Sequence, residues 1–122
     1  MNTKKLLAAA CAVMMGGILG AACGDDSADG ATGVCADVAC ENVPAFSTLA
    51  WDTCTSCHAA DAATRSANGV PDDSDYTTHA GAAKRAKDVA ARVADGTMPP
   101  GISITQQEKD AFVKWGCCDA PQ

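Results

Sequence analysis

The apolar positions of this chain form one continuous run near the N-terminus and three shorter patterned stretches further on. The run over residues 6–19 follows two lysines, is rich in Ala and Gly, and is followed by small residues. That order is typical of a secretory signal. As a membrane span the run is short, and two adjacent glycines interrupt it. We therefore expect an exported protein whose residues 1–22 are a signal peptide that is removed.

Two of the patterned stretches are separated by a long polar segment. The first begins near Ser47, a residue type that caps helix N-termini, and runs toward Cys54. The second covers residues 80–94, where apolar positions recur every three or four residues and so share one helix face. Gly96 is placed to end this second helix in the left-handed conformation.

The third patterned stretch begins at Thr105. Glu108 stands three residues later, which predicts a capping box, the reciprocal pairing of an N-cap residue with the third helical residue. Phe112 and Trp115 give the helix an apolar side, and Gly116 is placed to end it. Because no stretch alternates convincingly between apolar and polar residues, the sequence predicts an all-α fold.

The chain divides into a signal (1–22), a flexible tether (23–33) and one compact domain (34–119). The tether is polar and has no apolar periodicity. The domain has few aromatic residues and many alanines, and small domains of this kind usually need a disulfide, a metal or a cofactor. The loop at 59–79 is long for such a domain, and a loop of that length usually wraps something.

The most specific motif is Cys54-Thr55-Ser56-Cys57-His58. The Cys-x-x-Cys-His pattern is typical of c-type haem attachment. Cysteines three apart lie nearly one helical turn apart, so both sulfurs can form thioethers at one edge of a haem, and His58 can bind its iron. The sequence therefore predicts one covalently bound haem c at Cys54, Cys57 and His58.

The same two cysteines allow three other interpretations. A thiol redox site is expected in a strand–helix–strand context, which the pattern does not show. A zinc site could nominally combine Cys54 and Cys57 with Cys117 and Cys118, yet adjacent cysteines rarely both reach one tetrahedral metal. A plain disulfide between the two motif cysteines is the third alternative.

Residues 49–115 resemble a small class I cytochrome c domain. In that family a helix leads into Cys-x-x-Cys-His, a long loop lines the haem, a further helix precedes a loop that presents a methionine, and a final helix packs across the first. The stretch 95–100, Asp-Gly-Thr-Met-Pro-Pro, resembles the family's Gly-x-Met-Pro segment. The final helix ends in Trp115-Gly116, as expected. The loop 59–79 and the extra cysteines depart from the family pattern.

The resemblance implies that His58 and Met98 are the two axial ligands of the iron. Pro99 favours an extended backbone at Met98 and the following proline stiffens the loop. Methionine is also a common core filler, which is the alternative role for Met98. His79 is the other residue that could bind iron or act as a distal base, although a lone histidine at a helix start is more often solvated.

A second resemblance concerns the cysteine at the end of the signal. The segment 19–23 resembles a bacterial lipoprotein processing box, in which Cys23 becomes the lipidated first residue. Gly20 departs from the large aliphatic residue usual at its position. Ordinary cleavage that leaves a free thiol at Cys23 is the alternative.

Four cysteines then remain, enough for two disulfides: Cys35, Cys40, Cys117 and Cys118. Because the first and last helices pack together in the resembled fold, we expect Cys35 and Cys40 to pair with Cys117 and Cys118, in an unassigned order. The alternative is a local Cys35–Cys40 bond with a vicinal Cys117–Cys118 bond.

The net charge of the chain limits the classes of partner that it could bind. A chain that begins at Cys23 keeps seven basic and fifteen acidic residues, a net charge of −8. Nucleic acid and anionic lipid surfaces are therefore poor partners, and a redox protein with a basic docking face is favoured. The resulting hypothesis is a lipid-anchored monohaem cytochrome c, facing the periplasm, that transfers single electrons and is not an enzyme. A peroxidase-type haem enzyme and an interaction module held by zinc or disulfides are the alternatives.

Overall fold

The computed structural model describes residues 33–122, and its regular elements are all helical. In chain order they are η1 (Phe46–Thr48), α2 (Asp52–His58), α3 (His79–Ala83), α4 (Ala86–Ala94) and α5 (Gln106–Cys117). No strand occurs in residues 33–122, so the all-α prediction is confirmed for that part of the chain. The predicted signal peptide, Cys23 and nearly all of the tether lie outside the described residues.

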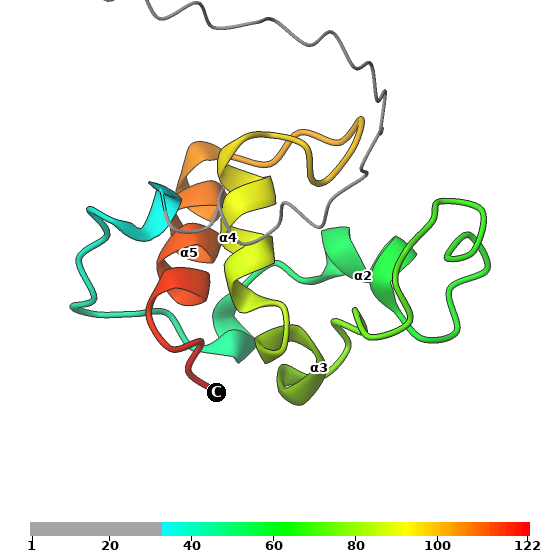
Figure 1. Ribbon diagram of the computed structural model, residues 1–122, viewed down its shortest axis with the longest axis horizontal. Helices are drawn as coiled ribbons and strands as arrows, with labels where there is room; N and C mark the ends of the chain where they lie inside the picture. The colour runs from blue at the N-terminus through cyan, green and yellow to red at the C-terminus, as the bar shows by residue number, and fades with distance from the viewer. Residues whose placement is uncertain (1–32) are drawn as a thin grey trace, which may run out of the picture.

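Helices α4 and α5 form the main helix pair, and Figure 1 shows them side by side. The capping box predicted for α5 is present: the Glu108 backbone N–H donates to the Thr105 hydroxyl oxygen (3.2 Å), and the Thr105 N–H donates to the Glu108 carboxylate (2.7 Å). The Thr105 N–H and hydroxyl both donate to the Glu108 carboxylate and so hold its pKa below the ordinary value. The local sequence therefore defines where this helix begins.

Gly116 does not end α5, as the sequence analysis expected, but lies buried inside it. A Cβ atom at this position would collide with the carbonyl oxygen of Ala86 and come within 2.9 Å of the Ala90 Cβ. The glycine is therefore required by the close approach of α4 and α5.

The helix predicted over 80–94 is divided into α3 and α4. Arg85 leaves the helical conformation at the junction (φ −116°, ψ 19°). Its guanidinium donates to Asp73 in the preceding loop (2.7 Å) and to Asp88 in the first turn of α4 (3.0 Å). Gly96 follows the end of α4 with φ +77°, as predicted for a left-handed terminator.

The prediction that an α-helix starts near Ser47 is wrong. Residues 46–48 form only a short 3-10 turn with Ala45 as its N-cap, and Leu49 then adopts an extended backbone. The α-helix begins three residues later, after Trp51, whose indole N–H donates to the Phe46 carbonyl (2.9 Å). As a consequence the Cys-x-x-Cys-His motif forms part of helix α2 and does not follow a helix.

An aromatic cluster connects α2 with α5. The Trp51 ring contacts Phe112 and Trp115 edge-on, with centroid distances of 4.9 and 5.2 Å, and Phe46 lies 4.9 Å from Trp51. Phe112 and Trp115 are fully buried. The residues before α2 thus pack on α5 through side chains, while the main helix partner of α5 is α4.

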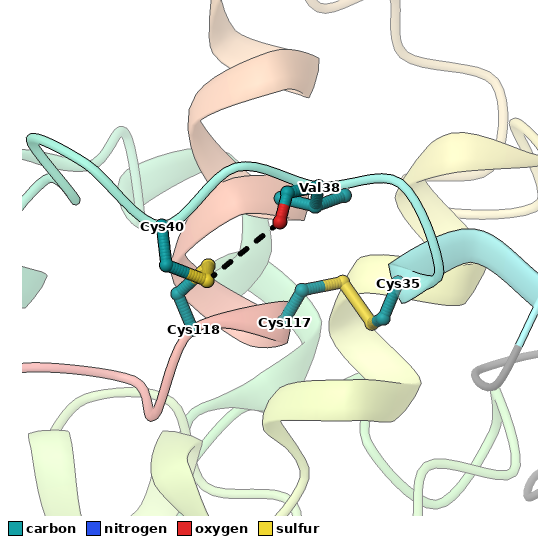
Figure 2. The surroundings of a disulfide bond; sticks show 5 residues. All are labelled: Cys35, Val38, Cys40, Cys117 and Cys118. Carbon is teal, nitrogen blue, oxygen red and sulfur yellow. Dashed lines mark hydrogen bonds between the residues drawn. A yellow bond between two sulfur atoms is a disulfide. The ribbon is translucent and has the colours of Figure 1, made fainter.

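Two disulfides join the N-terminal segment of the domain to the end of α5. Cys35 pairs with Cys117 and Cys40 with Cys118, with Cα–Cα distances of 5.2 and 5.5 Å. Figure 2 shows residues 35–40 crossing over the end of the last helix, with the Cys40 sulfur 3.8 Å from the Val38 carbonyl oxygen. The expected pairing between the two ends is confirmed, and the local alternative is wrong.

None of the helices within residues 33–122 is long and apolar enough to cross a membrane.

Candidate functional site

The three residues of the Cys-x-x-Cys-His motif occupy helix α2. Cys54 and Cys57 are free thiols, whereas the other four cysteines of the described segment are oxidised in disulfides. The helix ends at His58, because Ala59 turns to an extended backbone (ψ 148°). A Cys54–Cys57 disulfide is therefore absent, and Cys117 and Cys118 are held in disulfides, so they are not available as zinc ligands.

The two motif sulfurs have different surroundings. Cys54 packs against the hydrophobic core, and burial raises the pKa of its thiol to about 11. A thiol of this kind stays protonated at neutral pH, which does not suit a redox thiolate. The Cys57 sulfur instead accepts hydrogen bonds from the Asn68 side-chain amide (3.5 Å) and the Thr64 hydroxyl (3.8 Å).

The imidazole of His58 is held at one nitrogen. Its Nδ1 lies 3.2 Å from the Ser74 carbonyl oxygen and 3.3 Å from the Ser74 hydroxyl oxygen. Since a carbonyl oxygen can only accept, Nδ1 carries the proton and donates it. Nε2 then keeps its lone pair, and no described residue hydrogen-bonds to it. This is the arrangement in which metal-binding histidines are oriented by a second group.

The protonation state of His58 agrees with this geometry. Its pKa is lowered from the ordinary value, first by burial and also by the positive charge of Arg65, while the bond to Ser74 acts in the opposite direction. A neutral imidazole is the form that binds metals. His58 is therefore a ready ligand at neutral pH.

The loop between α2 and α3 closes over the end of α2. Its buried Arg65 donates to the carbonyl oxygens of Ala59 (3.1 Å) and Pro71 (2.6 Å). The Ser74 hydroxyl also donates to the Pro71 carbonyl (2.6 Å). Within residues 33–122 no carboxylate pairs with Arg65. The loop is thus folded around a buried cation, and this packing places Ser74 against His58.

Tyr76 completes the surroundings of His58. Its backbone N–H donates to the His58 carbonyl (2.9 Å), and its ring stacks on the imidazole with a centroid distance of 4.3 Å and an interplanar angle of 9°. Ser74, Tyr76 and Arg65 are not among the site residues predicted from the sequence. The only sequence signal for them is the unusual length of the loop.

Met98 follows α4 in a well-defined turn. The Asp95 carboxylate accepts from the Thr97 N–H (2.8 Å) and hydroxyl (2.7 Å), and the Met98 N–H donates to the Arg92 carbonyl (3.0 Å). The Met98 side chain is half-buried. In Figure 1 the segment after α4 extends toward the same side of the drawing as α2. No hydrogen bond joins Met98 to α2 among the described residues.

His79 is engaged elsewhere. It is the first residue of α3, and its Nε2 donates to the Ala120 carbonyl (2.7 Å). Its ring meets Phe46 and Trp115 edge-on at centroid distances of 5.6 and 6.4 Å. The residue therefore attaches the start of α3 to the C-terminal segment. The half-buried and hydrogen-bonded ring is not the solvated helix-start histidine that the sequence favoured.

The donor set of the described segment fits a haem better than a bare metal ion. Nowhere in residues 33–122 do three or more His, Cys, Asp or Glu side chains gather around a common metal position. The haem ring supplies four nitrogen ligands to its iron, so the protein needs to provide only one or two axial ligands. Two unpaired sulfurs on one helix and an adjacent histidine with a free nitrogen satisfy that smaller requirement.

No protein-family model matches the chain, and neither the curated proteins nor the solved structures contain a match.

Proposed function

We propose that this chain is a c-type monohaem cytochrome that transfers single electrons. The observation that carries the proposal is the state of α2, in which Cys54 and Cys57 are unpaired and His58 has a free Nε2, although four other cysteines of the domain form disulfides. In this proposal one haem is attached through the two sulfurs, and His58 with Met98 binds its iron in a class I cytochrome c-like fold.

The chemistry of each residue supports this assignment. A thioether carries no charge, so it suits the apolar surroundings that keep the Cys54 thiol neutral. Ser74 holds the proton on Nδ1 of His58 and leaves the other nitrogen for iron. The soft thioether of Met98 favours ferrous iron. When bound, the haem supplies a metal that changes by one electron between its ferric and ferrous states.

Two residues, Met98 and His79, could lie on the distal side of the haem iron, and their roles favour electron transfer over peroxidase chemistry. Peroxidase-type catalysis requires an open iron position and a distal base. Met98 fills that position in the proposed ligand set. His79, the only other histidine of the chain, is held in the aromatic cluster by edge-on contacts with Phe46 and Trp115 and by its bond to the Ala120 carbonyl.

The proposed location is the bacterial cell envelope, with the domain facing the periplasm. Export by the signal over 1–22 and lipidation at Cys23 are the basis of this proposal. The net charge of −8 for a chain that begins at Cys23 favours a redox partner with a basic docking face. Two disulfides in the domain agree with an oxidising compartment.

The test is the visible spectrum of the exported full chain, oxidised and reduced, before and after extraction with acidified organic solvent. We expect sharp bands on reduction and no haem in the extract. Cys54→Ala and Cys57→Ala should each lose one thioether. As a matched control, Cys40→Ala with Cys118→Ala removes two cysteines outside the motif and should keep the haem. Absence of haem bands in the wild-type chain would refute the proposal.

A further inference from the structure

We propose that Tyr76 is a positioning residue that fixes the plane of the His58 imidazole. The inference rests on the proposed function, because it concerns how His58 presents Nε2 to iron. It adds a residue that lies outside the Cys-x-x-Cys-His motif and eighteen positions after its histidine.

The two contacts of the imidazole restrain different motions. The Nδ1–H bond to the Ser74 carbonyl (3.2 Å) lies at the edge of the ring and fixes which edge faces the loop. By itself this bond lets the ring tilt about the line between the two bonded atoms. The Tyr76 ring covers one face of the imidazole at 4.3 Å and is parallel to it within 9°, so it removes that tilt. Together the two contacts define the direction of Nε2.

Tyr76 can act in this way because it is itself held. Its side chain is only 8% exposed, and its ring meets Trp51 edge-on at a centroid distance of 5.6 Å. Trp51 is in turn anchored by its indole N–H bond to the Phe46 carbonyl (2.9 Å). The backbone N–H of Tyr76 donates to the His58 carbonyl (2.9 Å), which fixes the backbone of the two residues relative to each other.

The ring of Tyr76, and not its hydroxyl group, is the part that this role requires. No described residue forms a hydrogen bond with the hydroxyl. A tyrosine is neutral at physiological pH, so the side chain places no charge beside His58. Phenylalanine should therefore preserve the function, and an aliphatic residue should not.

The experiment is electron paramagnetic resonance of the oxidised full chain carrying its haem. The plane of an axial imidazole sets the splitting of the iron d orbitals, so the g-values of low-spin ferric iron report it. The variants are Tyr76→Phe, Tyr76→Leu and Tyr76→Met, the last being an unbranched side chain of similar length without a planar face. Phe112→Leu is the matched control, because it removes a buried ring that contacts Trp51 and has no stacking contact with His58.

We expect Tyr76→Phe and Phe112→Leu to keep the wild-type g-values, and Tyr76→Leu and Tyr76→Met to shift and broaden the signal. Wild-type g-values in either aliphatic variant would overturn the inference. If neither aliphatic variant folds, nuclear Overhauser contacts between the His58 and Tyr76 rings in the reduced wild-type protein decide it, and their absence would overturn it. A wild-type chain without haem refutes the proposed function itself, an outcome distinct from unchanged g-values in a haem-loaded variant.

Discussion

Removing one of the two disulfides should cost much less stability than removing both. The bonds Cys35–Cys117 and Cys40–Cys118 span 82 and 78 residues and lie next to each other. Either bond alone therefore closes almost the same long loop. Once it is closed, the other bond only closes a small ring made of residues 35–40 and 117–118.

Loop-closure entropy gives the magnitudes. A cross-link lowers the entropy of the unfolded chain by about 2.1 + 1.5R ln n cal/mol/K for a loop of n residues. For a loop of 82 residues this is about 4.5 kcal/mol at 25 °C. For a ring of roughly eight residues it is about 2.5 kcal/mol. Loss of either bond should thus cost about 2.5 kcal/mol, and loss of both about 7 kcal/mol, which is comparable to the whole stability of a typical domain.

Urea unfolding followed by the emission of the buried Trp51 and Trp115 measures these costs. The variants replace each cysteine pair by alanine, singly and together, in the haem-loaded protein. Peptide mapping without reduction checks the connectivity of the bond that remains. If each single removal costs as much as half of the double removal, the shared-loop argument is wrong. A Cys35–Cys40 bond in the wild-type map would contradict the structure itself.

Three further predictions follow from the contacts described above. Gly116→Ala should destabilise the protein by about 1–3 kcal/mol in urea unfolding, because its Cβ would force α4 and α5 apart. Met98→Ala should abolish the weak far-red band of the oxidised protein and lower its potential, whereas His79→Ala should keep both. The hydrogen bond from Arg85 lowers the pKa of Asp73 from 3.8, so the ionised Asp73 stabilises the folded protein at higher pH, and this stabilisation is lost as the pH falls through the folded-state pKa. Asp73→Asn should therefore make the free energy of unfolding depend less on pH in the acid range.

Local sequence chemistry was sufficient where one short segment determines the outcome. The capping box at Thr105 and Glu108 involves residues three apart and needs no tertiary contact. Gly96 ends α4 because few other residues adopt its positive φ. The pairing of the terminal cysteines followed from the resemblance to a fold in which both ends meet, although the order 35–117 and 40–118 required the structure.

Long-range contacts account for what the sequence analysis missed. The break between α3 and α4 lies at Arg85, which pairs with Asp73 twelve residues earlier. The spacing of apolar residues cannot predict such an ion pair. A Cβ atom at Gly81 would collide with the Asp75 carbonyl oxygen, a contact that the helix periodicity over 80–94 does not predict. Ser74 and Tyr76 reach His58 only because the loop folds back over α2.

The central claim is that a haem is covalently attached at α2, and the intact mass of the exported full chain under denaturing conditions tests it most directly. The account predicts a polypeptide whose mass is increased by one haem, and a peptide spanning Cys54 to His58 that carries this haem through both sulfurs. A chain with the mass of the bare polypeptide, in which Cys54 and Cys57 both react with a thiol-alkylating reagent, would contradict it.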